Sequence, residues 1–248
     1  MAHVLENRDK LFRAAITLFA AKGFNGTSIR DIADAGADLV AVQELTPASA
    51  QALRDGLGAG YAHVILDASA GDIGLLSRYP ILSSERFRPA GTGRRALQAV
   101  LDVDGAATQV IVLHPVPPDL CWERSWPLPT GVRQDRVDRE LADAAARASR
   151  LPGPVIVLGD LNAGDLTRGY ASMAAVLADA YREAGSGFGF TFPFGLTLGD
   201  VSVPGPLVRI DYVFHSAHVY ARWARVGCGG SDHCYVLAEL VPVAPPVR

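Results

Sequence analysis

Residues 154–163 read Pro-Val-Ile-Val-Leu-Gly-Asp-Leu-Asn-Ala, and they are the most informative segment for the architecture of the chain. The uninterrupted apolar run Val155–Leu158 is typical of a short strand that is buried on both faces. Asp160 and Asn162 follow it two residues apart, so an extended backbone directs both side chains to the same side. An acid and an amide in this position either form an Asx turn that closes the strand, or reach into a cleft and act on a ligand. The other strand ends of the chain favour the second interpretation.

Polar side chains stand at the ends of further apolar runs. A single carboxylate or histidine in such a place is usually a turn residue or a solvated group, but several matched positions in one chain favour a common site. Phosphate-ester hydrolysis requires this combination of groups: carboxylates for a cation such as Mg²⁺, a group that positions water, and an imidazole oriented by a carboxylate. The candidates, in addition to Asp160 and Asn162, are Glu44, His114, Asp211, Asp232 and His233.

Strand-like and helix-like segments outline an α/β fold of the α+β type. Several strands follow one another without an intervening helix, which favours antiparallel pairing in two sheets over one doubly wound parallel sheet. We therefore expect a two-sheet β-sandwich flanked by helices. The expected strands are Leu39–Val42, Gly74–Ser77, Leu97–Val103, Gln109–Leu113, Val155–Leu158, Ile210–Phe214 and Tyr235–Leu240, and the expected helices are Ala48–Leu57, Arg133–Ser149 and Tyr170–Glu183.

Two long segments without a clear period lie between these elements. Residues 115–131 directly follow His114, and a long loop in a compact domain is often functional. Residues 185–206 carry phenylalanine at every second position from Phe188 to Phe194. That alternation favours a β-hairpin with one buried aromatic face over a substrate-binding rim.

Composition limits the functional classes. The 248 residues suit one large α/β domain with an appendage, and a net charge of −3 lacks the basic excess of a dedicated nucleic-acid binder. The longest apolar runs fall far short of the roughly 20 residues of a membrane helix, and the amino terminus is unlike a signal peptide. We therefore expect no membrane insertion and a cytoplasmic protein. Cys121, Cys228 and Cys234 show no metal-ligand spacing, and we expect free thiols rather than a Cys228–Cys234 bridge.

The amino-terminal segment follows a different pattern. Asn7–Lys22 places apolar residues at three- and four-residue spacings, which predicts an amphipathic helix, and a second short helix is expected from Thr27 or Ser28 to Ala35. Residues 8–36 resemble the start of the helix-turn-helix of tetracycline-repressor-type regulators.

This resemblance stops before the part that would read DNA. Residues 37–45 have the pattern of a buried strand where a recognition helix would follow. We therefore expect a helical segment over residues 1–36 and a separate domain over residues 37–248. A DNA-binding regulator is the weaker functional alternative.

From Asp38 to about Leu240, the chain resembles the endonuclease/exonuclease/phosphatase superfamily. The matching segments, in order, are DLVAVQE, GDIGLLSRYPI, VIVLHPVPP, VIVLGDLNA, RIDYVF and GSDHCYVLAEL. The resemblance implies a two-sheet α/β sandwich that uses Mg²⁺ or Mn²⁺ to hydrolyse a phosphomonoester or phosphodiester. It leaves a phosphorylated small molecule, a lipid-linked phosphate or a nucleic acid as the substrate.

Carried over residue by residue, the resemblance implies a role for each candidate. Glu44 becomes a metal ligand, Asp232 a candidate second acid at the metal site, Asp160 the water-activating or metal-linked carboxylate, Asn162 an orienting amide, His114 a phosphate contact, and His233 the catalytic imidazole with Asp211 as its partner.

The superfamily's first strand, which ends in an Asn that helps to bind metal and phosphate, has no expected counterpart. The regulator-like segment stands in its place, and Asn25 is the nearest substitute for that Asn. An interior strand that is lost leaves backbone groups unpaired. Either the amino-terminal segment fills the gap, or another chain pairs there, or the fold is marginal. We expect reduced metal affinity and turnover, and the main alternative function is an impaired homologue that only binds phosphorylated ligands.

Overall fold

The structure, a computed structural model, describes residues 12–18, 36–57, 60–68, 72–91, 93–123, 129–195, 197–198, 201–202 and 204–243. The strands are β1 (Phe12–Leu18), β2 (Leu39–Gln43), β3 (His63–Asp67), β4 (Ile73–Ser77), β5 (Ile81–Phe87), β6 (Ala96–Val103), β7 (Ala106–Leu113), β8 (Asp119–Trp122), β9 (Pro129–Arg133), β10 (Val155–Asp160), β11 (Ala178–Asp179), β12 (Thr197–Leu198), β13 (Val201–Ser202), β14 (Asp211–His215), β15 (Val219–Cys228) and β16 (Cys234–Pro242). The helices are α2 (Pro47–Leu57), α3 (Asp135–Ala148), α4 (Arg168–Ala174), α5 (Ala180–Ala184) and the short η2 (Pro89–Gly91).

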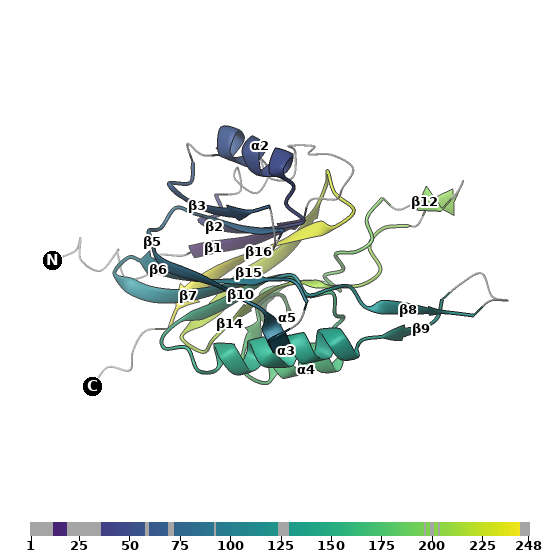
Figure 1. The fold of residues 1–248 in the computed structure, drawn as a ribbon. Coiled ribbons are helices and arrows are strands. Elements are labelled where there is room, and N and C mark those ends of the chain that lie inside the picture. Colours follow the sequence, from purple (N-terminus) through teal and green to yellow (C-terminus); the bar gives the residue numbers. More distant parts are fainter. Residues whose placement is uncertain are drawn as a thin grey trace.

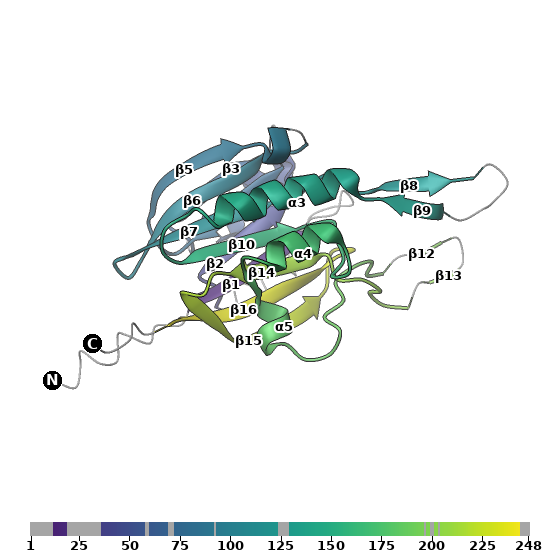
Figure 2. The same ribbon diagram turned by 90° about the horizontal axis from the view of Figure 1, so that it is seen from below.

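Two six-stranded sheets pack face to face (Figure 1). Their strand orders are β15-β16-β1-β2-β4-β3 and β11-β14-β10-β7-β6-β5. A parallel pair lies at the centre of each sheet, β1 with β2 and β7 with β10, and the other neighbours are antiparallel. The hairpins β8–β9 and β12–β13 extend from the same end of the molecule (Figures 1 and 2). The expected two-sheet sandwich flanked by helices is confirmed.

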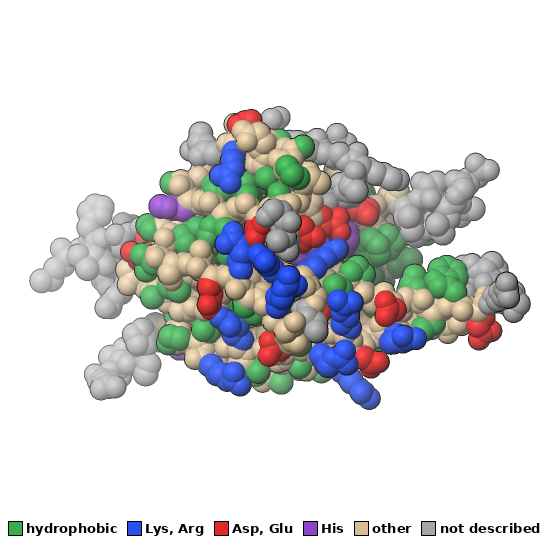
Figure 3. Space-filling model, in the orientation of Figure 1, with side chains coloured by type: hydrophobic (Ala, Val, Ile, Leu, Met, Phe, Trp, Pro, Cys, Tyr) green, Lys and Arg blue, Asp and Glu red, His purple; other side chains and the backbone are tan. Residues whose placement is uncertain are grey.

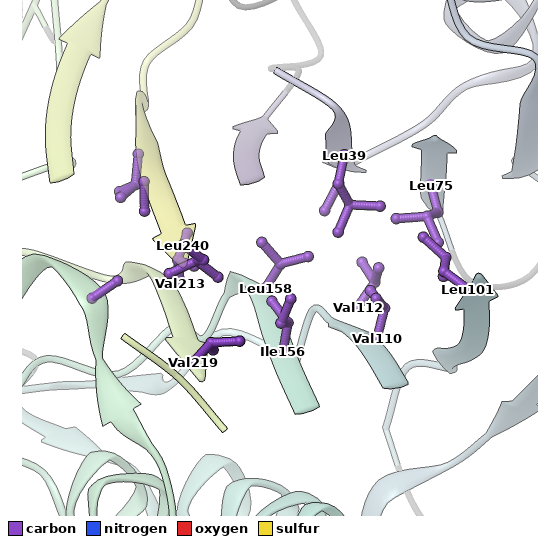
Figure 4. Close-up of a cluster of buried hydrophobic side chains, with 14 of the residues drawn as sticks. Leu39, Leu75, Leu101, Val110, Val112, Ile156, Leu158, Val213, Val219 and Leu240 are labelled. Carbon is purple, nitrogen blue, oxygen red and sulfur yellow. The ribbon is translucent and has the colours of Figure 1, made fainter. Parts of the chain in front are cut away.

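Apolar side chains fill three layers. Between the sheets, Leu39 and Leu75 of one sheet pack with Leu158 of the other (Figure 4). On the outer face of the second sheet, α3 buries Leu141, and Figure 2 shows this helix lying along the sheet. On the outer face of the first sheet, α2 buries Leu53. Because both faces of the central strands are covered, their sequences read as continuous apolar runs.

The amino-terminal segment contributes a central strand. β1 pairs antiparallel with β16 and parallel with β2. The expected helix over Asn7–Lys22 is therefore wrong at residues 12–18, because two neighbouring strands offer hydrogen bonds that outweigh a helical spacing of apolar residues. Of the three outcomes expected for the missing strand, the structure shows the first, since the chain itself fills the gap. The second expected helix and Asn25 lie outside the described residues, and the domain boundary at residue 36 stays a prediction.

The expected helix over Tyr170–Glu183 is divided into α4, β11 and α5. Asp179 causes the restart, because its carboxylate accepts the backbone N–H groups of Tyr181 and Arg182 and so caps α5. The loop expected at residues 115–131 contains the β8–β9 hairpin. No helix within the described ranges combines the length and apolar character needed to cross a membrane.

Candidate active site

Parallel pairing of β7 and β10 brings two of the predicted residues together. Gly159 lies opposite Leu113, so Asp160 and His114 leave the sheet side by side. A Cβ atom at residue 159 would lie 1.8 Å from the carbonyl oxygen of Leu113, so this close approach requires glycine. His114 Nε2 is 3.7 Å from a carboxylate oxygen of Asp160, and both side chains are almost fully buried. Two strand ends that are distant in sequence therefore present an acid and an imidazole at one place.

A second imidazole lies close to the same carboxylate. His233 stands just before β16, and its Nδ1 atom is 3.0 Å from the carboxylate of Asp211, which is itself paired with Asp160 across the β10–β14 ladder. Burial lowers the pKa of His233, but the hydrogen bond with Asp211 and the charges of Asp211, Asp160 and Asp232 outweigh it and raise the pKa to about 9. The ring is therefore held as an imidazolium at neutral pH.

The surroundings of Asp160 also change its acidity. Burial raises the pKa of Asp160 and the charge of Asp211 raises it further, while His114, His233 and the backbone N–H of Asn162 lower it, and the result is about 6. That N–H donates to Asp160 Oδ1 at 2.8 Å. A carboxyl group with this pKa is mostly ionised at neutral pH and still accepts a proton readily, as a general base must.

Thr191, which the sequence analysis missed, fixes the Asp211–His233 pair. Its Oγ1 accepts the backbone N–H groups of Ile210 and Asp211 at 3.1 and 3.3 Å. Its carbonyl oxygen accepts the N–H of Cys234 at 2.7 Å. This fully buried residue therefore joins the strand that carries the acid to the strand that follows the imidazole. Its only signal in the sequence was its place within the long segment 185–206.

A disulfide closes the loop that carries Asp232 and His233. Cys228 ends β15, Cys234 begins β16, and the two residues lie directly opposite each other and are bonded. The expectation of free thiols is wrong for this pair, because the antiparallel ladder that brings the two residues together cannot be read from their spacing. Cys121 is free, as expected.

A pocket of about 580 Å³ opens over the acid and the two imidazoles. Glu44 lies on its wall directly after β2, with a left-handed backbone at φ 55°. This conformation costs a residue such as glutamate of order 1–3 kcal/mol and is concentrated at functional sites. Asp211 stands behind His233, and the other predicted site residues line the pocket together: Glu44, His114, Asp160, Asn162, Asp232 and His233.

Two further residues that the sequence analysis missed hold His114. Asp72 Oδ1 lies 3.1 Å from His114 Nδ1, and Arg94 Nη1 contacts both ring nitrogens. Arg94 Nε is 3.6 Å from Asp72, which closes a three-membered cluster. Figure 3 shows basic and acidic side chains gathered near the centre of the face in view. Asp72 belongs to the segment GDIGLLSRYPI, which is one of the segments that resemble the superfamily. Nothing in the sequence around Arg94 indicated a role at the site.

Solved structures with the same fold include proteins from animals and bacteria. They include D. rerio TDP2 complexed with single strand DNA product (TM-score 0.72, 16% identity, covering 94% of this chain and 99% of that one). A second is an endonuclease/exonuclease/phosphatase from Bacteroides vulgatus (0.70, 19%, 94% and 100%), and a third is sphingomyelinase C from Streptomyces griseocarneus (0.64, 20%, 93% and 99%). At these identities the likeness shows the fold alone.

Sequence comparison gives the family. No curated protein matches the chain significantly. The model of the Endonuclease/Exonuclease/phosphatase family matches residues 20–233, which is most of the sequence. The chain therefore belongs to the Endonuclease/Exonuclease/phosphatase family.

Proposed function

We propose that this protein is a divalent-metal-dependent phosphoesterase, which hydrolyses a phosphomonoester or phosphodiester bond through attack by water. One observation carries the proposal: the buried carboxylate of Asp160 stands beside two imidazoles, one of them held as an imidazolium, in a pocket that Glu44 also lines. Membership of the family supports it.

In this proposal Asp160 is the general base. It accepts a proton from water while the water oxygen bonds to phosphorus and the bond between phosphorus and the leaving oxygen breaks. The leaving oxygen takes its proton from solvent. The imidazolium of His233, oriented by Asp211, donates a hydrogen bond to the phosphoryl oxygens as their negative charge grows. His114 contacts these oxygens from the other side, and Asn162 orients the water.

Mg²⁺ or Mn²⁺ is the cofactor that we propose, and the donor set fits a hard cation. No three His, Cys, Asp or Glu side chains in the described part of the chain form a metal cage, and Mg²⁺ commonly binds one or two carboxylates and completes its shell with water and phosphate oxygens. Glu44 would hold the ion, and Asp232 is the second candidate. The adjacent amide of Gln43 is fully buried, and neither of its polar atoms has a hydrogen-bond partner among the described residues, which is compatible with a polar ligand bound beside Glu44. When bound, the cation would neutralise charge on a phosphoryl oxygen.

Three substrate classes are compatible with this chemistry: a phosphorylated small molecule, a lipid-linked phosphate and a nucleic acid. One similar structure is bound to a single strand DNA product, and another is a sphingomyelinase C. These neighbours support the nucleic-acid and lipid classes as candidates.

Hydrolysis of a small panel tests the proposal. An aryl phosphate, a bis-aryl phosphodiester, an abasic-site DNA duplex and an isoprenyl diphosphate are each assayed with Mg²⁺ or Mn²⁺, and with excess chelator. The variant His233→Ala is compared with His218→Ala, which changes an exposed histidine outside the pocket. We expect chelator-sensitive turnover that falls at least about 10³-fold in His233→Ala and is unchanged in His218→Ala.

A folded chain without turnover on any substrate would contradict the proposal. Circular dichroism and a cooperative thermal transition establish the folded state in the same sample. Binding of phosphorylated ligands without turnover would then support the alternative of an impaired homologue. Turnover that persists in excess chelator would contradict the metal dependence alone.

A further inference from the structure

We propose that the pocket takes a phosphoester that carries a long apolar chain, and that the cross-strand pair Leu120–Val132 on the β8–β9 hairpin selects this substrate. The inference deepens the proposed function and rests on it, because the phosphoryl group must lie at Asp160 for the chain to lie along the hairpin.

The first apolar wall is the β8–β9 hairpin. Leu120 and Val132 lie directly opposite each other in its ladder, and both line the pocket. They are 50% and 55% exposed, an unfavourable state for two large apolar side chains at the edge of a polar site. Pro117 and Pro118 connect this hairpin to His114 and also line the pocket. The apolar wall therefore begins within a few residues of an active-site imidazole.

The second apolar wall is a pair of the same kind. Phe192 and Val208 form an isolated bridge, and both line the pocket. The ring of Phe192 is 4.5 Å from the ring of His233. The β-hairpin with one buried aromatic face that we expected at residues 185–206 is therefore wrong, because Phe188 is 82% exposed. Phe192 instead lies on the rim of the pocket. An apolar chain that leaves the phosphoryl position would lie between two cross-strand apolar pairs.

The charged side chains at the pocket favour one phosphoryl group over many. Among the described residues, three carboxylates line it, those of Glu44, Asp160 and Asp232, and no Lys or Arg does. A nucleic acid carries a phosphate on every nucleotide, and proteins hold these phosphates mainly with Lys and Arg. Flanking phosphates within the pocket would meet these carboxylates or the apolar walls. Figure 3 shows hydrophobic side chains on the projecting β8–β9 hairpin, which continues the apolar surface outward.

Chain length is the variable that the walls should recognise. Each methylene removed from water contributes about 0.8 kcal/mol, which is a factor of about four in affinity when burial is complete. An ester with a chain long enough to reach Leu120 and Val132 should therefore be preferred over a short one with the same phosphoryl group.

The test compares two esters that differ only in the chain. Wild-type protein with Mn²⁺ is assayed on 4-nitrophenyl butyl phosphate and 4-nitrophenyl dodecyl phosphate, both as monomers. The double variant Leu120→Asn with Val132→Thr keeps the size of both side chains and adds no charge. Leu82→Asn is the matched control, because Leu82 is a 60% exposed leucine on β5 that does not line the pocket.

We expect kcat/KM of the wild type to be at least tenfold higher for the dodecyl ester. The double variant should lose about tenfold on the dodecyl ester and less than twofold on the butyl ester, and Leu82→Asn should match the wild type on both. A preference for the dodecyl ester over the butyl ester that is seen with monomers supports the inference and assigns the source as a free amphiphile. A preference that is seen only when the dodecyl ester is presented in phosphatidylcholine vesicles also supports it and assigns the source as a membrane lipid. Equal kcat/KM for the two esters, or an equal loss on both, overturns the inference and leaves the proposed function standing.

A binding measurement separates the two proposals when no ester is hydrolysed. Butylphosphonate and dodecylphosphonate are titrated by calorimetry into the wild type and the double variant. Tighter binding of dodecylphosphonate that is lost in the double variant supports the apolar subsite even though the proposed activity has failed. Equal binding of the two phosphonates overturns the subsite.

Discussion

The two histidines beside Asp160 are held in opposite ways. His233 lies on a loop, and its partner Asp211 is 1% exposed. His114 continues a central strand, and its partner Asp72 is 31% exposed and shared with Arg94. A loop residue must be fixed by a buried charge, whereas a residue at a strand end is already placed by the sheet. His233 therefore depends on Asp211 for both its charge and its position, whereas His114 depends on Asp72 and Arg94 mainly for the orientation of its ring.

The largest expected effect comes from removal of the buried charge behind His233. Asp211→Asn keeps the shape of the side chain but removes the group that orients the ring and raises its pKa. We expect kcat to fall about 10³- to 10⁴-fold, as when a catalytic histidine loses its carboxylate. Steady-state kinetics beside Asp55→Asn, an exposed acid on α2, measures it. A loss below tenfold would show that His233 depends on its carboxylate partner no more than His114 does.

The pH dependence of stability should report the same buried pair. The folded pKa of His233, about 9, lies above its ordinary value of 6.5, so protonation stabilises the fold. This contribution is complete below about pH 6.5 and is lost as the pH rises through 9, and it amounts to about 3 kcal/mol at most. Urea unfolding of chelator-treated protein at pH 6 and pH 9.5 measures it. Asp211→Asn should show a much smaller decline, and an equal decline in both proteins would contradict the assignment.

The disulfide should affect only the His233 side of the site. Replacing Cys228 and Cys234 with Ser opens the loop that carries this residue, and closure of so short a loop contributes about 2 kcal/mol to stability. We expect this loss in the free energy of unfolding and a several-fold fall in kcat, because His233 is less well positioned. Cys121→Ser is the control. Dithiothreitol should reproduce the effect in the wild type, and an unchanged kcat would show that Thr191 and Asp211 suffice.

The smallest effect in free energy is expected on the His114 side, because a tenfold change in rate corresponds to about 1.4 kcal/mol. Asp72→Asn removes one of two groups that hold the ring, so we expect a fall of about tenfold in kcat/KM, mainly through KM. Arg94→Gln should cost a similar amount. Because both residues act on one ring, the double variant should lose clearly less than the product of the single losses. A double-mutant cycle measures this coupling. Strictly additive losses would show that Asp72 and Arg94 act independently of each other.

Much of the fold and of the site could be predicted from the sequence. Continuous apolar runs such as Val155–Leu158 identified the central strands, because a strand that is buried on both faces carries apolar residues at successive positions. The same runs located Asp160, His114 and Asp211 at strand ends, where the sheet brings them together. The charged and apolar alternation of residues 133–149 identified α3.

The remaining features depend on contacts between distant segments. β1 has the spacing of a helix, and only the neighbours β2 and β16 make it a strand. Arg94 reaches His114 across 20 residues from a loop without a motif. The Cys228–Cys234 bond requires the β15–β16 register, which the spacing of the two cysteines does not reveal. Local sequence patterns therefore predicted the features that depend on a single segment. They failed for features that depend on contacts between two segments distant in the sequence.

The bond between Cys228 and Cys234 also makes the site dependent on where the chain folds. Thiols pair in secreted and periplasmic surroundings and stay reduced where glutathione and thioredoxin act. The same polypeptide should therefore turn over more slowly where its thiols stay reduced than where the bond between Cys228 and Cys234 forms. Activity measured on a purified sample would then reflect the redox history of the cell fraction that produced it.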